Sequence, residues 1–87
     1  VLVRAEDTGG AWSLVDFAMP ARYGGPPVHV HDTFTESFHC VEGGVTLALD
    51  GRTVPLRTGE TAVVPPGVPH AFANPHDAPA RLLLWLT

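Results

Sequence analysis

Hydrophobic and polar residues alternate along this chain in short runs that glycine and proline interrupt. No window of 11 residues has a helical period, whereas a period of two is typical of strands with one buried face. The pattern predicts strands over 11–19, 36–43 and 80–87, and a hairpin over 45–56. Asp50-Gly51, at the centre of the hairpin, is a strong signal for a tight two-residue turn.

Further short strands are expected on both sides of a Pro-Pro-Gly turn within 61–74, and at 26–30 after a glycine-rich turn. The whole chain, 1–87, is therefore predicted to be one all-β domain with about eight or nine short strands. The last strand is apolar at every position from 82 to 86. A strand with one face in water alternates, so both faces of this strand should be covered.

Composition narrows the class of protein. At 87 residues, with 45% hydrophobic and 16% charged residues, the sequence indicates one globular domain rather than a disordered chain. A net charge of -4 and scattered arginines argue against a nucleic acid or an anionic membrane as partner. No apolar run is long enough to span a membrane. A single cysteine and no visible signal peptide favour a reducing compartment, so a cytoplasmic location is the expectation.

Histidines give the sequence its candidate chemistry. His29 and His31 are two residues apart and would share one face of a strand, and Glu36 follows after a short turn. His70 lies far downstream, on a segment that the fold must bring back. Three imidazoles and one carboxylate suit a divalent transition metal ion, whereas Ca²⁺ and Mg²⁺ prefer oxygen ligands. Four ligands leave open positions on a metal that prefers five or six, which favours a catalytic site.

The spacing of these residues resembles the two motifs of the cupin superfamily. In the first motif, His29, His31, Glu36 and Gly43 are at the expected separations, although Tyr23 replaces the leading glycine. The second motif is matched at every position, by Gly59, Pro65, Gly67, His70 and Asn74. The resemblance spans more than half of the chain. It implies a small jelly-roll barrel, the cupin double-stranded β-helix, with His29, His31, Glu36 and His70 as ligands of one divalent metal ion (Fe, Mn, Ni, Zn, Cu or Co).

Cupins have many functions, so three remain open. The first is a metal-dependent oxygenase acting on a small enolic or phenolic substrate, because the context of His29 and His31 resembles quercetin-dioxygenase-like cupins. Glu36 would be both a ligand and a candidate general base. The second is a metal-dependent isomerase, cyclase or lyase, in which the metal acts on a carbonyl. The third is a non-catalytic cupin that binds a small molecule.

Other residues have simpler expected roles. Alternation directs His39 away from Glu36, so His39 is expected on the outside of the barrel. Cys40 is expected to be a small buried residue rather than a nucleophile. Asn74 is expected to make a structural hydrogen bond or to lie near the metal. A domain of this size has a small core, and the apolar run 82–86 needs a second covering layer. That layer is either an N-terminal strand such as 11–19 or the same surface of a second subunit, and a homodimer is expected.

Overall fold

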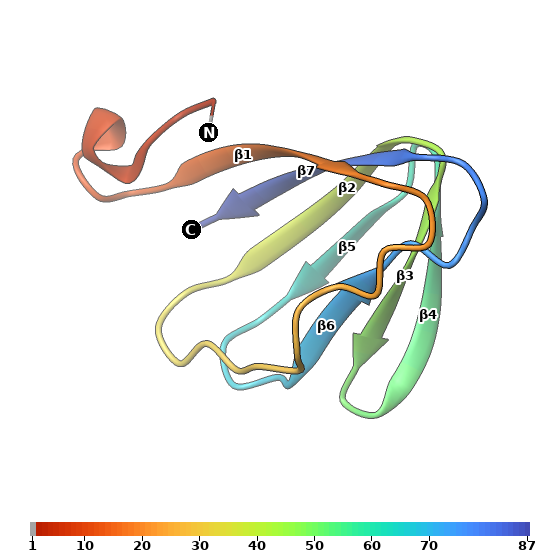
Figure 1. Ribbon diagram of the computed structural model, residues 1–87. Coiled ribbons are helices and arrows are strands. Elements are labelled where there is room, and N and C mark those ends of the chain that lie inside the picture. The colour runs from red at the N-terminus through yellow and green to blue at the C-terminus, as the bar shows by residue number, and fades with distance from the viewer. Residues whose placement is uncertain (1) are drawn as a thin grey trace.

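Seven strands form two sheets in the computed structural model, which describes residues 2–87 (Figure 1). One sheet has four strands in the order β1-β7-β2-β5, and the other has three in the order β4-β3-β6. The strands are β1 (Ser13–Met19), β2 (Glu36–Glu42), β3 (Gly44–Leu49), β4 (Arg52–Arg57), β5 (Thr61–Val64), β6 (His70–Ala73) and β7 (Ala80–Leu86). This confirms the predicted all-β class.

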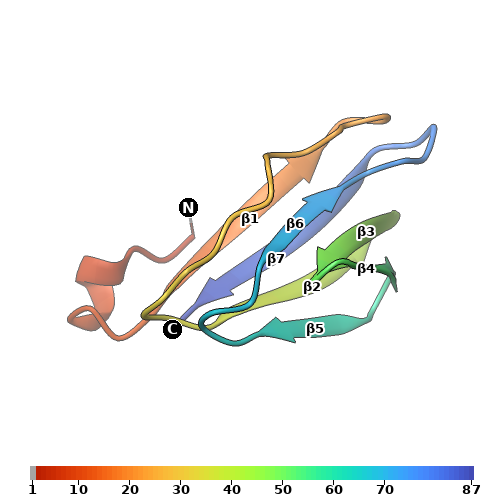
Figure 2. The same cartoon turned by 90° about the horizontal axis from the view of Figure 1, so that it is seen from below.

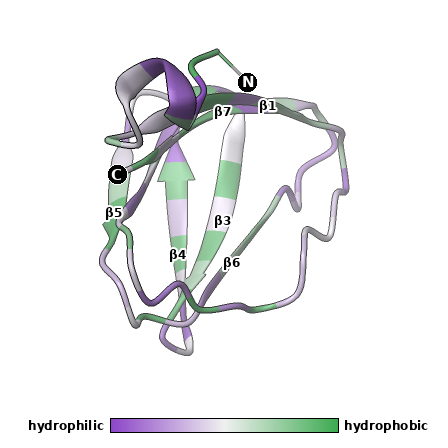
Figure 3. Ribbon diagram, turned by 90° about the vertical axis from the view of Figure 1, so that its left-hand side faces the viewer, coloured by the Kyte–Doolittle hydropathy of each residue, from purple (hydrophilic) through white to green (hydrophobic). Residues whose placement is uncertain are grey.

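The four-stranded sheet is built around the apolar C-terminal strand. β7 pairs antiparallel with β1 on one side and with β2 on the other, and β2 also pairs with β5. The inward faces of these strands follow the alternation of the sequence, because Leu82 and Leu84 are buried while Arg81 and Trp85 are exposed. The two sheets enclose the core between them, and the chain traces a closed outline in Figure 3.

The hairpin is as predicted. β3 and β4 pair in register from Gly44↔Arg57 to Leu49↔Arg52, and Asp50 and Gly51 both have positive φ angles, of 49° and 82°. Positive φ at both central residues defines the type I′ turn, whose twist matches that of the strands it joins.

The core lies where the inward faces of both sheets meet. Its fully buried side chains include Phe38 and Cys40 of β2, Leu47 of β3 and Leu82 of β7. Phe72 of β6 joins this cluster and packs against Phe38, with ring centroids 5.6 Å apart. Aromatic pairs at such distances add to the stability that comes from burial alone.

The expectation of a strand over 26–30 is wrong in part. This segment belongs to a long irregular connection between β1 and β2, which runs beside β6 in Figures 1 and 2. Single bridges join it to the first residue of β6, by His29↔His70, and to the residue just after β6, by Tyr23↔Asn74. Pro26 and Pro27 have no amide hydrogen to donate, so a continuous ladder cannot form there. The structure accordingly has fewer strands than the sequence predicted.

The N-terminal segment before β1 contains one short 3-10 helix, η1 (Ala5–Thr8), which the sequence analysis did not predict. Leu2 and Val3 return along β1 and bond to Leu14. No helix in the described part of the chain is long and apolar enough to cross a membrane.

Candidate metal centre

The backbone pairing of His29 with His70 brings together the two separated segments that carry the candidate ligands. Each residue donates its backbone N–H to the other's carbonyl oxygen, with both N···O distances at 3.0 Å. Residues directly opposite in an antiparallel pair project to the same face. The bridge therefore places both imidazoles on one side, with ring centroids 4.5 Å apart.

His31 and Glu36 are positioned by separate backbone contacts. The amide of Gly67, in the turn before β6, donates to the carbonyl oxygen of His31 at 2.7 Å. Thr35 and Thr87 exchange two backbone hydrogen bonds of 2.9 Å, which fix the chain where β2 begins. Glu36 is then the first residue of β2 and is only 6% exposed, so its side chain is on the inner face of the sheet.

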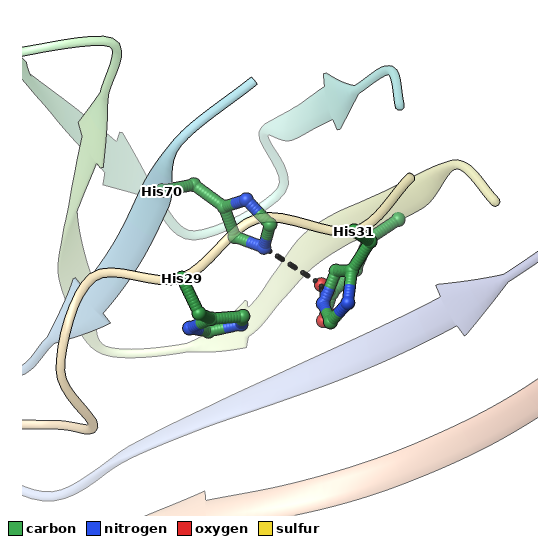
Figure 4. Close-up of side chains that lie close together, drawn as sticks. His29, His31 and His70 are labelled. Carbon is green, nitrogen blue, oxygen red and sulfur yellow. Dashed lines mark hydrogen bonds and ion pairs between the residues drawn. The ribbon is translucent and has the colours of Figure 1, made fainter. Parts of the chain in front are cut away.

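All four predicted residues converge. Each offers a potential ligand atom, and these atoms lie within 4.8 Å of one another. Glu36 Oε1 is 3.0 Å from Nε2 of His70 and 3.1 Å from Nε2 of His31. Figure 4 shows the rings of His29, His31 and His70 close together, with His29 and His31 on the connecting segment and His70 on β6. The expected convergence, with His70 inside the barrel, is confirmed.

Two of the imidazoles are held in one tautomer by the backbone. Nδ1 of His29 is 3.0 Å from the carbonyl oxygen of Pro27, and Nδ1 of His70 is 2.9 Å from that of Val68. A carbonyl only accepts, so Nδ1 must carry the hydrogen in both bonds. In a neutral ring Nε2 then has a free lone pair, which is the form that binds a metal.

This tautomer creates a mismatch at the centre of the site. The lone pair of His70 Nε2 faces Glu36 Oε1, which is itself an acceptor when ionised. Two acceptors at 3.0 Å repel unless a cation, either a proton or a metal ion, lies with them. His70 is 2% exposed and Glu36 6%, so water cannot readily supply that compensation. The donor set therefore fits a bound divalent transition metal ion.

His31 is held differently from the other two histidines. Its side chain is 27% exposed, and its ring stacks on Phe34, with centroids 4.3 Å apart and planes tilted by 30°. Phe34 was missed by the sequence analysis, as were the carbonyls of Pro27 and Val68. The only signal for Phe34 in the sequence is its position three residues after His31. The two backbone carbonyls have no sequence signal, because every residue carries one.

The remaining candidates lie away from the centre. His39 is on the outer face of β2 and bonds to Thr61 Oγ1 at 2.7 Å, as alternation predicted. Cys40 is fully buried, and burial raises the pKa of its thiol, which agrees with a packing role. Asn74 has a structural role, because its side chain donates to the carbonyls of Pro20 and Ala78 and accepts from the amide of His76.

Comparison with known proteins agrees with this geometry. The family model described as a cupin domain matches residues 16–86. Among curated proteins, the "Polyketide synthase CurC" of Streptomyces cyaneus is 36% identical over 59 residues, covering 68% of this chain and 38% of that protein. The "Quercetin 2,3-dioxygenase" of Bacillus subtilis is 36% identical over 44 residues, covering 51% of this chain and 13% of that protein. The chain spans less than half the length of these curated relatives.

Solved structures share the fold. A predicted oxalate decarboxylase from Thermotoga maritima has a TM-score of 0.89 at 16% identity, covering 97% of this chain and 73% of its own. A sugar phosphate isomerase of the cupin superfamily from Silicibacter pomeroyi has a TM-score of 0.79 at 26% identity, covering 95% of this chain and 55% of its own.

Proposed function

The chain belongs to the cupin family, and from this premise we propose that His29, His31, Glu36 and His70 bind one divalent transition metal ion. The observation that carries the proposal is the pair of backbone-fixed imidazoles, one of which directs its Nε2 lone pair at a buried carboxylate oxygen. That arrangement is costly without a cation and favourable with a metal ion at its centre.

We propose further that the metal-loaded protein is an oxygenase acting on a small enolic or phenolic substrate. The similarity to a quercetin 2,3-dioxygenase supports this choice. A bound metal would supply Lewis acidity and, if it is redox-active, access to dioxygen chemistry. Glu36 would accept the proton of the substrate hydroxyl at a carboxylate oxygen. Its near-complete burial would keep that carboxylate away from competing hydrogen bonds with water.

A second candidate is a metal-dependent cyclase, isomerase or lyase. Two comparisons favour it: the relative named as a polyketide synthase, which matches a larger share of this chain, and the structural neighbour named as a sugar phosphate isomerase. The same four residues would serve, and Glu36 would move a proton on a carbonyl substrate without any need for O₂. A purely ligand-binding cupin would use the site without turnover.

Metal analysis tests the proposal directly. We expect protein purified without added metal to contain close to one metal ion per chain by elemental analysis. His31→Ala should lose it yet remain folded, because the histidines lie on segments fixed by their own backbone bonds. His39→Ala is the matched control, since its imidazole is on the outer face and should leave the metal content unchanged.

Turnover then separates the candidates. A redox-active metal together with O₂ uptake that depends on an added flavonol, catechol or β-diketone supports the oxygenase. Zinc without O₂ uptake supports the cyclase, isomerase or lyase. Protein that contains no metal and binds none on addition contradicts the metal site itself.

We also propose that the protein is a homodimer joined through the outer face of the four-stranded sheet. Trp85 on that face is 49% exposed and Val63 is 60% exposed, so the apolar face is incompletely covered within one chain.

A further inference from the structure

An apolar pocket lies at the end of the four-stranded sheet where β1 begins and β7 ends. Its volume is about 230 Å³, and its walls come from the N-terminal segment, from the end of the connection that precedes β2 and from the end of β7. Trp12, Phe34 and Leu86 provide the large apolar surfaces, while Ala5, Gly10 and Ala11 keep the space between them open.

Two walls of this pocket adjoin the metal ligands directly. Leu86 is the cross-strand partner of Glu36 on the inner face of the sheet. Side chains of such partners start about 5 Å apart. Phe34 has one side against the ring of His31, at 4.3 Å between centroids, and also lines the pocket. Phe34 and Leu86 therefore each line the pocket and also adjoin one of the candidate metal ligands.

The size and chemistry of the pocket suit one kind of occupant. A cavity of about 150 Å³ is enough for benzene, so this one accommodates a single ring with a substituent. None of its walls carries a charged side chain. An apolar group bound there would gain binding free energy by leaving water, whereas an ionic or heavily hydroxylated group would lose hydrogen bonds to water.

We propose that this pocket is the subsite for an aromatic or similar apolar part of the ligand, whose oxygen atoms bind at the metal centre. The inference rests on the proposed metal site and narrows the substrate class to molecules that combine an oxygen chelating group with an adjoining ring. Small hydrophilic oxygen ligands such as oxalate or sugar phosphates would leave the pocket unused.

Two chelating probes that differ in the ring test the proposal. Acetohydroxamate and benzohydroxamate share one metal-binding group, and only the second has a phenyl ring beside it. Zn²⁺-loaded protein avoids redox reactions, and calorimetry measures both dissociation constants. We expect benzohydroxamate to bind at least about tenfold more tightly than acetohydroxamate, because its phenyl ring is buried.

Pocket variants test whether the tighter binding of benzohydroxamate, here called the ring advantage, comes from this pocket. Ala11→Phe should fill the space and reduce the affinity ratio of benzohydroxamate to acetohydroxamate to about twofold or less. Acetohydroxamate affinity should not change. Trp12→Ala removes a wall and should also lower the ratio. Ala78→Phe is the matched control, because Ala78 is exposed in the turn before β7 and should leave the ratio at its wild-type value.

The outcomes distinguish this inference from the proposed function. If acetohydroxamate binds but the ring gives no advantage, or the advantage survives Ala11→Phe, the subsite is wrong while the metal centre stands. If Zn²⁺ does not bind at all, the metal centre and the subsite are both overturned.

Discussion

At the scale of single residues, the three histidines of the candidate centre are not equivalent. His29 and His70 are each fixed by a hydrogen bond from Nδ1 to the carbonyl two residues earlier. The ring of His31 is instead packed against Phe34. Hydrogen bonds to metal-binding histidines fix both tautomer and orientation. His31 thus depends on aromatic packing for the orientation that the other two obtain from the backbone.

This difference between the histidines leads to a prediction about Phe34. Phe34→Ala should weaken Zn²⁺ or Co²⁺ binding about tenfold, because the His31 ring loses the surface that orients it. Competition with a coloured chelator measures the change. Phe34→Tyr, which keeps the ring, should restore wild-type affinity, and the melting temperature of the metal-free protein should move little. Equal metal affinity in Phe34→Ala and wild type would show that His31 needs no such support.

Asn74 illustrates a residue that the sequence pattern marked without revealing its role. It is fully buried, and its three side-chain hydrogen bonds join the turn after β6 to the connection after β1. An amide of this kind satisfies several backbone groups at once, and its loss leaves them unpaired in the interior. The residue belongs to the scaffold that holds β6, and therefore His70, in place.

At the scale of elements, the irregular connection between β1 and β2 is what completes the site. It lies against β6 closely enough that a Cβ atom on Gly25 would be 1.8 Å from the carbonyl oxygen of Phe72. Gly25 also has a φ of +79°, which side chains disfavour. The close approach at Gly25 and the His29↔His70 bridge together fix how the connection is aligned with β6.

Gly25→Ala is therefore predicted to damage the metal centre from a distance. The added methyl group must push the connection away from β6, which should lengthen the separation of His29 and His70 and reduce metal affinity at least tenfold. Metal titration monitored by calorimetry provides the measurement.

The neighbouring Gly24→Ala is the matched control, since a Cβ atom there would meet nothing within 4 Å. It should bind metal as the wild type does. If both variants retain full affinity, the connection is flexible enough to absorb the methyl group, and its close packing on β6 does not position the ligands.

The same element shows how far the sequence could predict this fold. Alternation and the Asp50-Gly51 turn were enough to place β2, β3 and β4 nearly to the residue, because their signals are local. The spacing of both motifs identified the four converging residues. The connection over 20–35 was beyond local rules, since its course depends on backbone bonds to a segment about forty residues away.

The apolar pocket could not be predicted from the sequence either. Ala5, Trp12, Phe34 and Leu86 are scattered across the chain, and nothing in their spacing marks them as neighbours. They meet because the strand order β1-β7-β2 brings the beginning of β1, the end of β7 and the beginning of β2 to the same end of the sheet. Their proximity therefore depends on the topology of the sheet.

At the scale of the whole molecule, the two faces of the four-stranded sheet differ in how completely they are covered. The inner face lies on the core, where Leu82 is fully buried and Leu84 is 8% exposed. On the outer face Leu14, Leu83 and Trp85 surround a hollow of about 290 Å³, which His39 also lines. Trp12 packs edge-on against Trp85, with ring centroids 6.0 Å apart, and covers only part of this surface.

The expectation that both faces of β7 are covered is therefore met on one side only within a single chain. Trp85 remains 49% exposed and Val63 on β5 remains 60% exposed. A second copy related by a two-fold axis would bury the same apolar surface twice, which benefits a domain with so small a core. Sedimentation at micromolar concentration should therefore give twice the chain mass of 9.2 kDa.

Trp85→Glu should convert this dimer to a monomer, because it places a charge at the centre of the apolar face, where pairing would leave the carboxylate buried and unpaired. Val28→Glu is the matched control. Val28 is 62% exposed on the connection beside β6 rather than on this sheet, so its substitution should leave the dimer intact. Circular dichroism establishes that each variant is folded. A wild-type protein that sediments at the mass of one chain, or a Trp85→Glu variant that remains dimeric, would exclude this face as the interface.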